Sequence, residues 1–144
     1  MRALKKIVLD LNYMRQFTQN KYIEAERKNR YIGAKMKKEA TNYSRAVVAQ
    51  AMQNGIQFNW PVKLVFVWYL PDKKIDPDNW SFLKKFIFDG MQRAIINRKP
   101  FLDNDNFTNV HKGYNESFEI DKRHPRLEIY EVEIWTKKIV FTRN

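Results

Sequence analysis

Residues 62–70 constrain the fold of this chain more than any other stretch. Their sequence, VKLVFVWYL, is rich in β-branched and aromatic side chains, and Pro71 closes the run. A run of this length is too short to cross a membrane as a helix, and its composition is typical of a mostly buried strand. Residues 126–140 predict another strand, because RLEIYEVEIW alternates polar and apolar side chains with a period of two.

Two helices are expected between and before these strands. Residues 32–54 predict a long amphipathic helix, with Gly55 at the position of a C-terminal cap. Residues 79–97 predict a second helix with one wide apolar stripe. That stripe consists of Phe82, Leu83, Phe86, Ile87, Met91 and Ala94.

The other segments complete the expected architecture. Residues 5–12 and 109–120 predict two further strands, whereas the polar and aromatic segment up to Arg30 has no clear period. We therefore predict an α+β fold in which residues 1–144 form a single domain, with a mixed β-sheet packed by two main helices.

Composition and charge narrow the classes of function. The chain has 144 residues, 44% of them hydrophobic, which suits one packed domain. It has no cysteine and no signal-peptide pattern, so we expect a soluble cytoplasmic protein without disulfides or a membrane span. Lysine and arginine number 27 against 16 acidic residues, and this excess favours nucleic acid as a partner. A merely solubilising surface is the alternative.

An acidic pair stands out against this basic background. Asp76 and Asp78 flank Pro77, which disfavours helix for Asp76 and extends the chain at a strand-to-helix junction. The two carboxylates then project the same way and repel each other unless a cation lies between them. The structural alternative is that Asp78 or Asn79 caps the following helix.

One lysine of the second helix is expected to face this pair. At about 100° per residue, Lys85 lies about 20° from Asp78 on the helix, and Lys84 lies about 100° off that line. Lys85 and Asp89 are also spaced as an ordinary i, i+4 surface pair. The later loop adds Asp103 and Asp105, for which turn formation is the structural alternative.

Together these residues suggest a Mg²⁺ site. Mg²⁺ prefers oxygen ligands and is commonly held by one or two carboxylates and a substrate phosphate. Asp76 and Asp78 would form one wall, Asp105 another, and Lys85 would add a positive charge where negative charge develops. The chain has no glycine-rich phosphate loop, so no nucleotide cofactor is expected, and His111 and His124 show no ligand spacing.

The chain resembles the RusA-type Holliday-junction resolvases, in particular their phage and prophage branch. The resemblance covers most of the sequence and keeps five segments in order. They are YIEAERKNRYIGAKMKKEAT at residues 22–41, PVKLVFVWYLPDKKIDPDN at 61–79, KKFIFDGM at 84–91, LDNDNF at 102–107 and FEIDKRHPRLEI at 118–129. The most specific element is the D-x-D-N sequence followed by a lysine-bearing helix with an Asp-Gly step.

This resemblance implies catalytic and metal-binding residues. It assigns the three family aspartates to Asp76, Asp78 and Asp105 and the catalytic lysine to Lys85. The lysine follows the Asp-Asn step by two helical turns instead of one, so Lys84 is the fallback, and Asp103 is the alternative to Asp105.

The resemblance also implies a function. The implied protein is a homodimeric endonuclease, encoded by a phage or prophage, that makes paired symmetric cuts in four-way DNA junctions. It depends on Mg²⁺, with Mn²⁺ as a possible substitute. The alternative is a non-catalytic phage DNA-binding accessory protein. For phosphate contacts we expect residues of two basic segments, and Tyr69 and Trp80 are candidates for stacking on bases. The phosphate-binding candidates are Arg27, Arg30, Lys35, Lys37 and Lys38.

Overall fold

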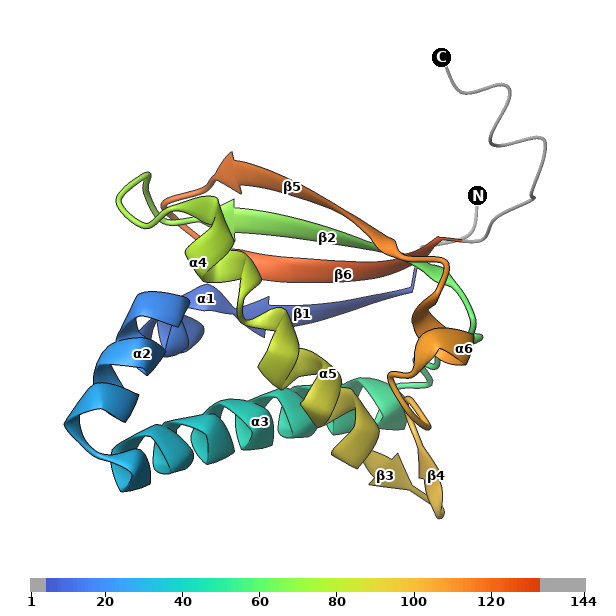
Figure 1. Ribbon diagram of the computed structural model, residues 1–144. Coiled ribbons are helices and arrows are strands. Elements are labelled where there is room, and N and C mark those ends of the chain that lie inside the picture. Colours follow the sequence, from blue (N-terminus) through green and yellow to red (C-terminus); the bar gives the residue numbers. More distant parts are fainter. Residues whose placement is uncertain (1–4, 133–144) are drawn as a thin grey trace.

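The computed structural model describes residues 5–132 and has the predicted α+β architecture, a mixed sheet with helices packed on it (Figure 1). Its elements, in chain order, are β1 (Lys6–Asp10), α1 (Leu11–Met14), the 3-10 helix η1 (Arg15–Phe17), α2 (Gln19–Lys28), α3 (Arg30–Gln53), β2 (Lys63–Leu70), α4 (Pro77–Ser81), α5 (Lys84–Arg93), β3 (Ile95–Ile96), β4 (Lys99–Pro100), α6 (Phe107–Val110), β5 (Tyr114–Ile120) and β6 (Arg126–Val132).

The main sheet has four strands in the order β1-β6-β2-β5. β6 pairs antiparallel with β1 and β2, whereas β2 and β5 run parallel. Burial alternates strictly along β2, so only one face of this strand is fully covered. The covered face packs Phe66, Trp68, Leu127 and Ile129 against the helices, and it explains the apolar content of residues 62–70.

The long predicted helix is confirmed as α3, which starts two residues earlier than expected. It ends at the expected glycine, because Gly55 adopts φ +88°, a conformation that side chains with a Cβ rarely take. α5 packs across α3 at Gly90 (Figure 1). A Cβ at Gly90 would lie 2.5 Å from Ser44 Cβ and 2.7 Å from Arg45 N, so only glycine permits this approach.

The prediction of a single continuous second helix is wrong. Residues 77–93 form two short helices, α4 and α5, separated at Phe82 and Leu83. Backbone bonds of i to i−3 spacing around this step tighten the chain, which buries Leu83 and leaves Phe82 partly exposed. The helix also ends at Arg93, before a β3–β4 hairpin whose turn residues Asn97 and Arg98 have positive φ.

The other departures concern the segment before Arg30 and the last two predicted strands. The segment up to Arg30, expected to be irregular, contains α1, η1 and α2; its period is weak because Ala25 is the one fully buried residue of α2. Residues 109–120 begin with the end of α6, and the strand starts only at Tyr114. β6 confirms the start of the last predicted strand, while residues 133–140 lie outside the described residues. Across residues 5–132, none of the helices has the length and apolarity needed to span a membrane.

Candidate active site

The acidic pair lies where the chain leaves the end of β2 and enters α4. Asp76 occupies the N-cap position in an extended conformation, φ −64° and ψ 147°, as expected for a residue before proline. Its side chain makes no capping hydrogen bond. Asp78 lies in the first turn of α4, and both carboxylates are exposed. The expectation that Asp78 or Asn79 holds the cap position is therefore wrong, and the carboxylate in that position does not cap.

Asn79 has a structural role instead. Its side chain is almost fully buried, and its Oδ1 accepts a hydrogen bond of 3.0 Å from the backbone N–H of Asn20. Asn20 lies in the first turn of α2, where the N-cap residue Thr18 makes no side-chain capping bond. Asn79 thus satisfies an N–H at the start of α2 and holds α4, with its two aspartates, against that helix.

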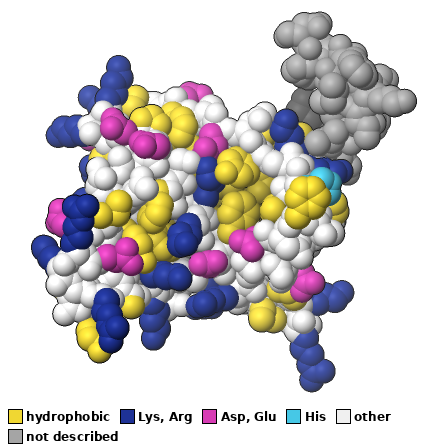
Figure 2. All heavy atoms as spheres, in the orientation of Figure 1, with side chains coloured by type: hydrophobic (Ala, Val, Ile, Leu, Met, Phe, Trp, Pro, Cys, Tyr) yellow, Lys and Arg dark blue, Asp and Glu magenta, His cyan; other side chains and the backbone are white. Residues whose placement is uncertain are grey.

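A second loop with basic side chains starts beside the loop that leads to the acidic pair. Because β2 and β5 are parallel, residues 71–76 and 121–125 leave the same edge of the sheet, and Asp121 N donates to Leu70 O at 2.8 Å. Both loops carry exposed basic side chains, namely Lys73, Lys74, Lys122 and Arg123. Figure 2 shows lysine and arginine side chains gathered at this upper left corner of the molecule, near carboxylates. We name these four residues the loop basic cluster.

The two candidate lysines have different surroundings. Lys84 is largely buried: its ammonium lies 2.7 Å from Glu116 Oε1, donates to Ser81 Oγ at 2.5 Å, and lies 4.4 Å from the ring centre of Tyr114. Glu116 also accepts a bond of 2.9 Å from Trp68 Nε1. Lys84 is therefore engaged by the sheet and is not available to the aspartates.

Lys85 is exposed at the start of α5. The helical wheel that placed it beside Asp78 assumed one continuous helix, so the break at Phe82 and Leu83 removes that argument. The expected role of Lys85 stays a prediction that rests on the resemblance and on its exposure.

Asp103 and Asp105 lie in the exposed loop before α6. The turn is held by the neighbouring asparagines: Asn106 Oδ1 caps α6 by accepting from Asn109 N at 3.1 Å, and Asn104 O accepts from Asn109 Nδ2 at 2.6 Å. Figure 1 shows this loop near α6, at the opposite end of α5 from α4. Within residues 5–132 no group of three or more histidine, aspartate and glutamate side chains could hold a metal ion.

Asp76 and Asp78 thus stand together at the start of α4, and within residues 5–132 no third carboxylate or histidine completes a metal-holding group with them. The pair still offers two exposed oxygen ligands at the start of a helix, and its donor chemistry suits Mg²⁺ held by carboxylates, water and a substrate phosphate. Asp76 and Asp78 therefore suit one side of the expected Mg²⁺ site.

The predicted phosphate-binding residues on the helices are all exposed. Arg27 closes α2, and Arg30, Lys35, Lys37 and Lys38 lie in the first turns of α3, on the same side of the molecule as α4 (Figure 1). The two candidates for stacking on bases are covered by other parts of the protein. Trp80 is fully buried, and one face of Tyr69 is covered by the Arg126 guanidinium at 3.9 Å.

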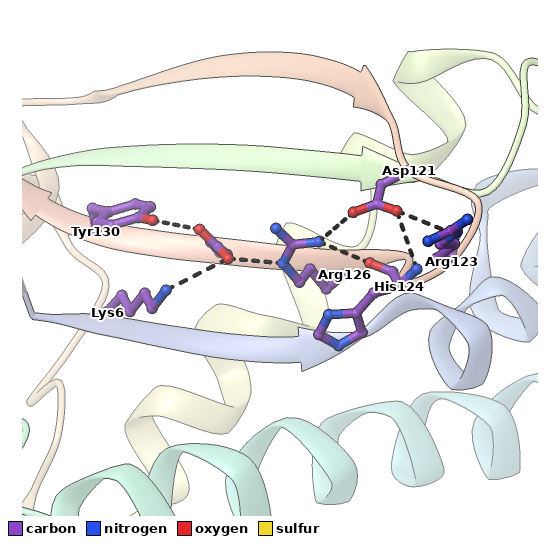
Figure 3. Close-up of polar contacts among 7 residues, drawn as sticks. Lys6, Asp121, Arg123, His124, Arg126 and Tyr130 are labelled. Atoms are coloured by element: carbon purple, nitrogen blue, oxygen red, sulfur yellow. Dashed lines mark hydrogen bonds and ion pairs between the residues drawn. The ribbon is translucent and has the colours of Figure 1, made fainter.

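A polar network on the uncovered face of the sheet fixes the second loop (Figure 3). Arg126 donates to Asp121 Oδ2 at 2.9 Å and to Glu128 Oε2 at 2.8 Å. Asp121 Oδ1 accepts from the backbone N–H groups of Arg123 and His124. The network thus holds the turn that carries two members of the loop basic cluster.

The same contacts shift the titration of the network. The hydrogen bond from Arg126 holds the pKa of Asp121 below its ordinary value. Burial acts to raise the pKa of Glu128, but bonds from Tyr130 and Arg126 outweigh it and the pKa is lowered. Burial and the bond to Glu128 raise the pKa of Tyr130 to about 12. Both carboxylates are therefore held in their charged form.

Sequence reasoning missed the loop basic cluster and the Lys84–Glu116 pair. The signals were present as the basic pairs at residues 73–74 and 122–123, each beginning within three residues of the end of a predicted strand. The two basic pairs lie at the same end of the sheet only because β2 and β5 pair in parallel, and the sequence did not predict this pairing.

Comparison with known proteins adds no assignment. No protein-family model matches this chain, and neither a curated protein nor a solved structure shows significant similarity to it.

Proposed function

We propose that this protein is a Mg²⁺-dependent endodeoxyribonuclease of the RusA type that cuts four-way DNA junctions. It would act as a homodimer in the cytoplasm of a bacterium and be encoded by a phage or prophage. The observation that supports it best is Asp76, an N-cap residue whose exposed carboxylate makes no cap and lies beside Asp78. The two adjacent carboxylates repel each other, and among the described residues neither side chain has a hydrogen bond or ion pair that would offset the repulsion. A bound cation would offset it.

The residues can be given distinct tasks in strand cleavage. Asp76 and Asp78 would hold Mg²⁺, or Mn²⁺ in its place, together with the phosphate to be cut. The bound ion supplies Lewis-acid stabilisation of the developing charge and a more acidic water. The loop basic cluster would bind phosphates next to the cut, and Lys85 would offset negative charge on the reacting phosphate. Asp105 lies in the exposed loop before α6 and keeps a predicted role only through the resemblance.

The test is cleavage of a synthetic four-way junction against a linear duplex of matched sequence, with Mg²⁺ or EDTA. The variants are Asp78→Asn, which removes one carboxylate charge, and Glu39→Gln, which removes a charge from the exposed face of α3. We expect junction-selective, Mg²⁺-dependent cutting that Asp78→Asn abolishes and Glu39→Gln leaves intact. Equal cutting by Asp78→Asn would contradict the assigned site.

A non-catalytic DNA-binding protein is the second candidate, and it is favoured by the observation that the acidic pair has no third ligand among the described residues. On this alternative, the acids at the start of α4 act only through the favourable interaction of carboxylates with a helix N-terminus. Tight junction binding without cleavage in Mg²⁺ or Mn²⁺ would select this candidate over the nuclease.

A further inference from the structure

The strand β5 forms an open edge of the main sheet. It pairs with β2 on one side only, and Figure 1 shows no described element beyond it. Proteins usually protect such edges with charged side chains, especially lysine, or with proline, a bulge or a covering segment. The sequence of β5, YNESFEI, has neither proline nor a basic residue, and one of its two glutamates, Glu116, is paired with Lys84. The strand exposes two large apolar side chains, Tyr114 at 45% and Ile120 at 42%.

The direction of its hydrogen bonds shows which residues face outward. Leu64 N donates to Gly113 O at 3.0 Å, and Asp121 N donates to Leu70 O at 2.8 Å. In this parallel register the odd-numbered residues of β5 direct their N–H and C=O groups to β2. The even-numbered residues therefore direct theirs to the open edge. They are Tyr114, Glu116, Phe118 and Ile120.

We propose that β5 pairs antiparallel with β5 of a second copy of this chain, about a two-fold axis at Ser117. Tyr114 then lies opposite Ile120 of the second copy, and Glu116 lies opposite Phe118. All four outward-facing residues of each strand meet a partner with the same outward direction, as an antiparallel ladder requires. Each exposed tyrosine covers an exposed isoleucine, and the symmetry repeats this pairing twice.

Charge supports this register over its neighbours. No two carboxylates face each other: Glu119 lies opposite Asn115, and Glu116 is already neutralised by Lys84 within its own protomer. An axis at Glu116 would place two copies of that glutamate directly opposite each other. An axis at Phe118 would move Tyr114 beyond the end of the partner strand and leave it exposed.

The other sheet edge is less suited to self-pairing. β1 has five residues, and Lys6 and Asp10 stand at its two ends. Its side chains are also engaged: Lys6 forms an ion pair with Glu128, and Asp10 caps α1 by accepting from Asn12 N. β5 is the longer edge and has no basic residue to oppose a second strand.

The proposed β5 pairing adds a dimer interface to the proposed function. The test of this pairing does not depend on that function. The two Ile120 Cα atoms would lie about 20 Å apart along the joined strands, and the two loop basic clusters would stand at opposite ends of the pair. Two-fold symmetric sites of this kind suit paired cuts in a symmetric DNA junction, which is the part that rests on the proposed function. The association itself is measured without DNA or metal.

A single introduced cysteine tests the register directly, because the natural chain has none. In the proposed dimer Ser117 faces its own copy at a non-hydrogen-bonded position, with Cα atoms about 4.5 Å apart, which suits a disulfide. Asn115, exposed on the same face of the same strand, would lie about 13 Å from its copy, which is too far. We expect Ser117→Cys to form a covalent dimer under mild oxidation and Asn115→Cys to remain uncrosslinked.

Analytical ultracentrifugation of the cysteine-free protein supplies the second measurement. We expect a dimer that Ile120→Lys shifts to monomer while its circular dichroism spectrum stays native. A monomer at all concentrations up to about 100 μM, or equal crosslinking of the two cysteine variants, would overturn the proposal. A monomer would also remove the homodimer from the proposed function, but Mg²⁺-dependent cleavage at the acidic pair would still be tested separately. A dimer that crosslinks at Ser117 and cuts no junction would contradict the function alone.

Discussion

At the scale of single residues, the position of the acidic pair depends on the contact that holds α4 against α2. Asn79 links α4 to the first turn of α2 through one buried hydrogen bond. We expect Asn79→Ala to lower the free energy of unfolding by about 1–2 kcal/mol, because it leaves the Asn20 N–H without its partner. Asn79→Asp keeps an acceptor oxygen and should lose less. Chemical denaturation of both variants measures the difference, and an Ala variant as stable as wild type would contradict this role.

The Lys84–Glu116 pair makes a second prediction at this scale. Both side chains are largely buried, at 13% and 19% exposure, so each needs the other's charge. Glu116→Gln should destabilise the fold by about 1–3 kcal/mol, since it leaves the ammonium of Lys84 without a counter-charge. Glu119→Gln, exposed on the same strand, serves as the matched control and should stay within about 0.5 kcal/mol of wild type. Equal stabilities in urea denaturation would show that the pair is not stabilising.

The polar network on the uncovered sheet face makes stability depend on pH. The pKa values of Asp121 and Glu128 are lowered in the folded state, so the unfolded chain binds more protons in acid. Their contribution is present above the ordinary carboxyl pKa and is lost as the pH falls through the lowered values. We expect Arg126→Met to be less stable than wild type at pH 7 and the gap to shrink at pH 3. A gap that is constant across this range in denaturation experiments would contradict the assignment.

At the scale of secondary-structure elements, the crossing of α3 and α5 rests on Gly90. Gly90→Ala would force a Cβ against the backbone of α3, and we expect a loss of about 1–3 kcal/mol despite the better helix propensity of alanine. Gly33→Ala is the comparison, because only a side-chain atom, Glu26 Cγ at 2.6 Å, lies within 3 Å of the added Cβ there, whereas at Gly90 two backbone atoms of α3 do. Thermal unfolding should therefore rank Gly90→Ala well below Gly33→Ala, and the reverse order would contradict the close approach.

The elements with strong periodicity were those that the sequence predicted well. β2, β6 and α3 follow from alternation, β-branched content and a helical stripe with a glycine stop. α2 was missed because a mostly exposed helix carries little apolar period. The break between α4 and α5 was missed because Leu83, Phe86 and Ile87 keep a helical spacing through it, and the placement of Lys85 failed with it.

At the scale of the whole molecule, the candidate site is made by topology. The acids at the start of α4 were visible in the sequence, but the loop basic cluster exists only because β2 and β5 run parallel and end at the same edge. Long-range pairing of this kind leaves no local pattern in the sequence. The same limit applies to Asp105, which the resemblance assigned to one site with the acidic pair, whereas the described residues contain no group of three or more such side chains suited to a metal ion.

Residues 5–132 carry two groups of exposed basic side chains, the loop basic cluster and the start of α3, and the proposed function assigns DNA phosphates to both. Removing one lysine–phosphate interaction should reduce the slope of log K against log salt by about 0.9 for duplex arms. We expect Lys73→Gln with Lys122→Gln to flatten the slope by about 2. Lys35→Gln with Lys38→Gln tests the helical surface in the same way, and unchanged slopes for both double variants would argue against phosphate binding at either surface.

The central claim is that the carboxylates at the start of α4 perform metal-dependent cleavage. Its most direct test is the single-turnover rate on a pre-bound four-way junction, followed as Mg²⁺ is added to wild type and to Asp78→Asn. We expect junction binding to stay within about twofold while the rate falls at least about 100-fold in the variant. A variant that cuts at the wild-type rate, or a wild type that binds and never cuts, would contradict the claim.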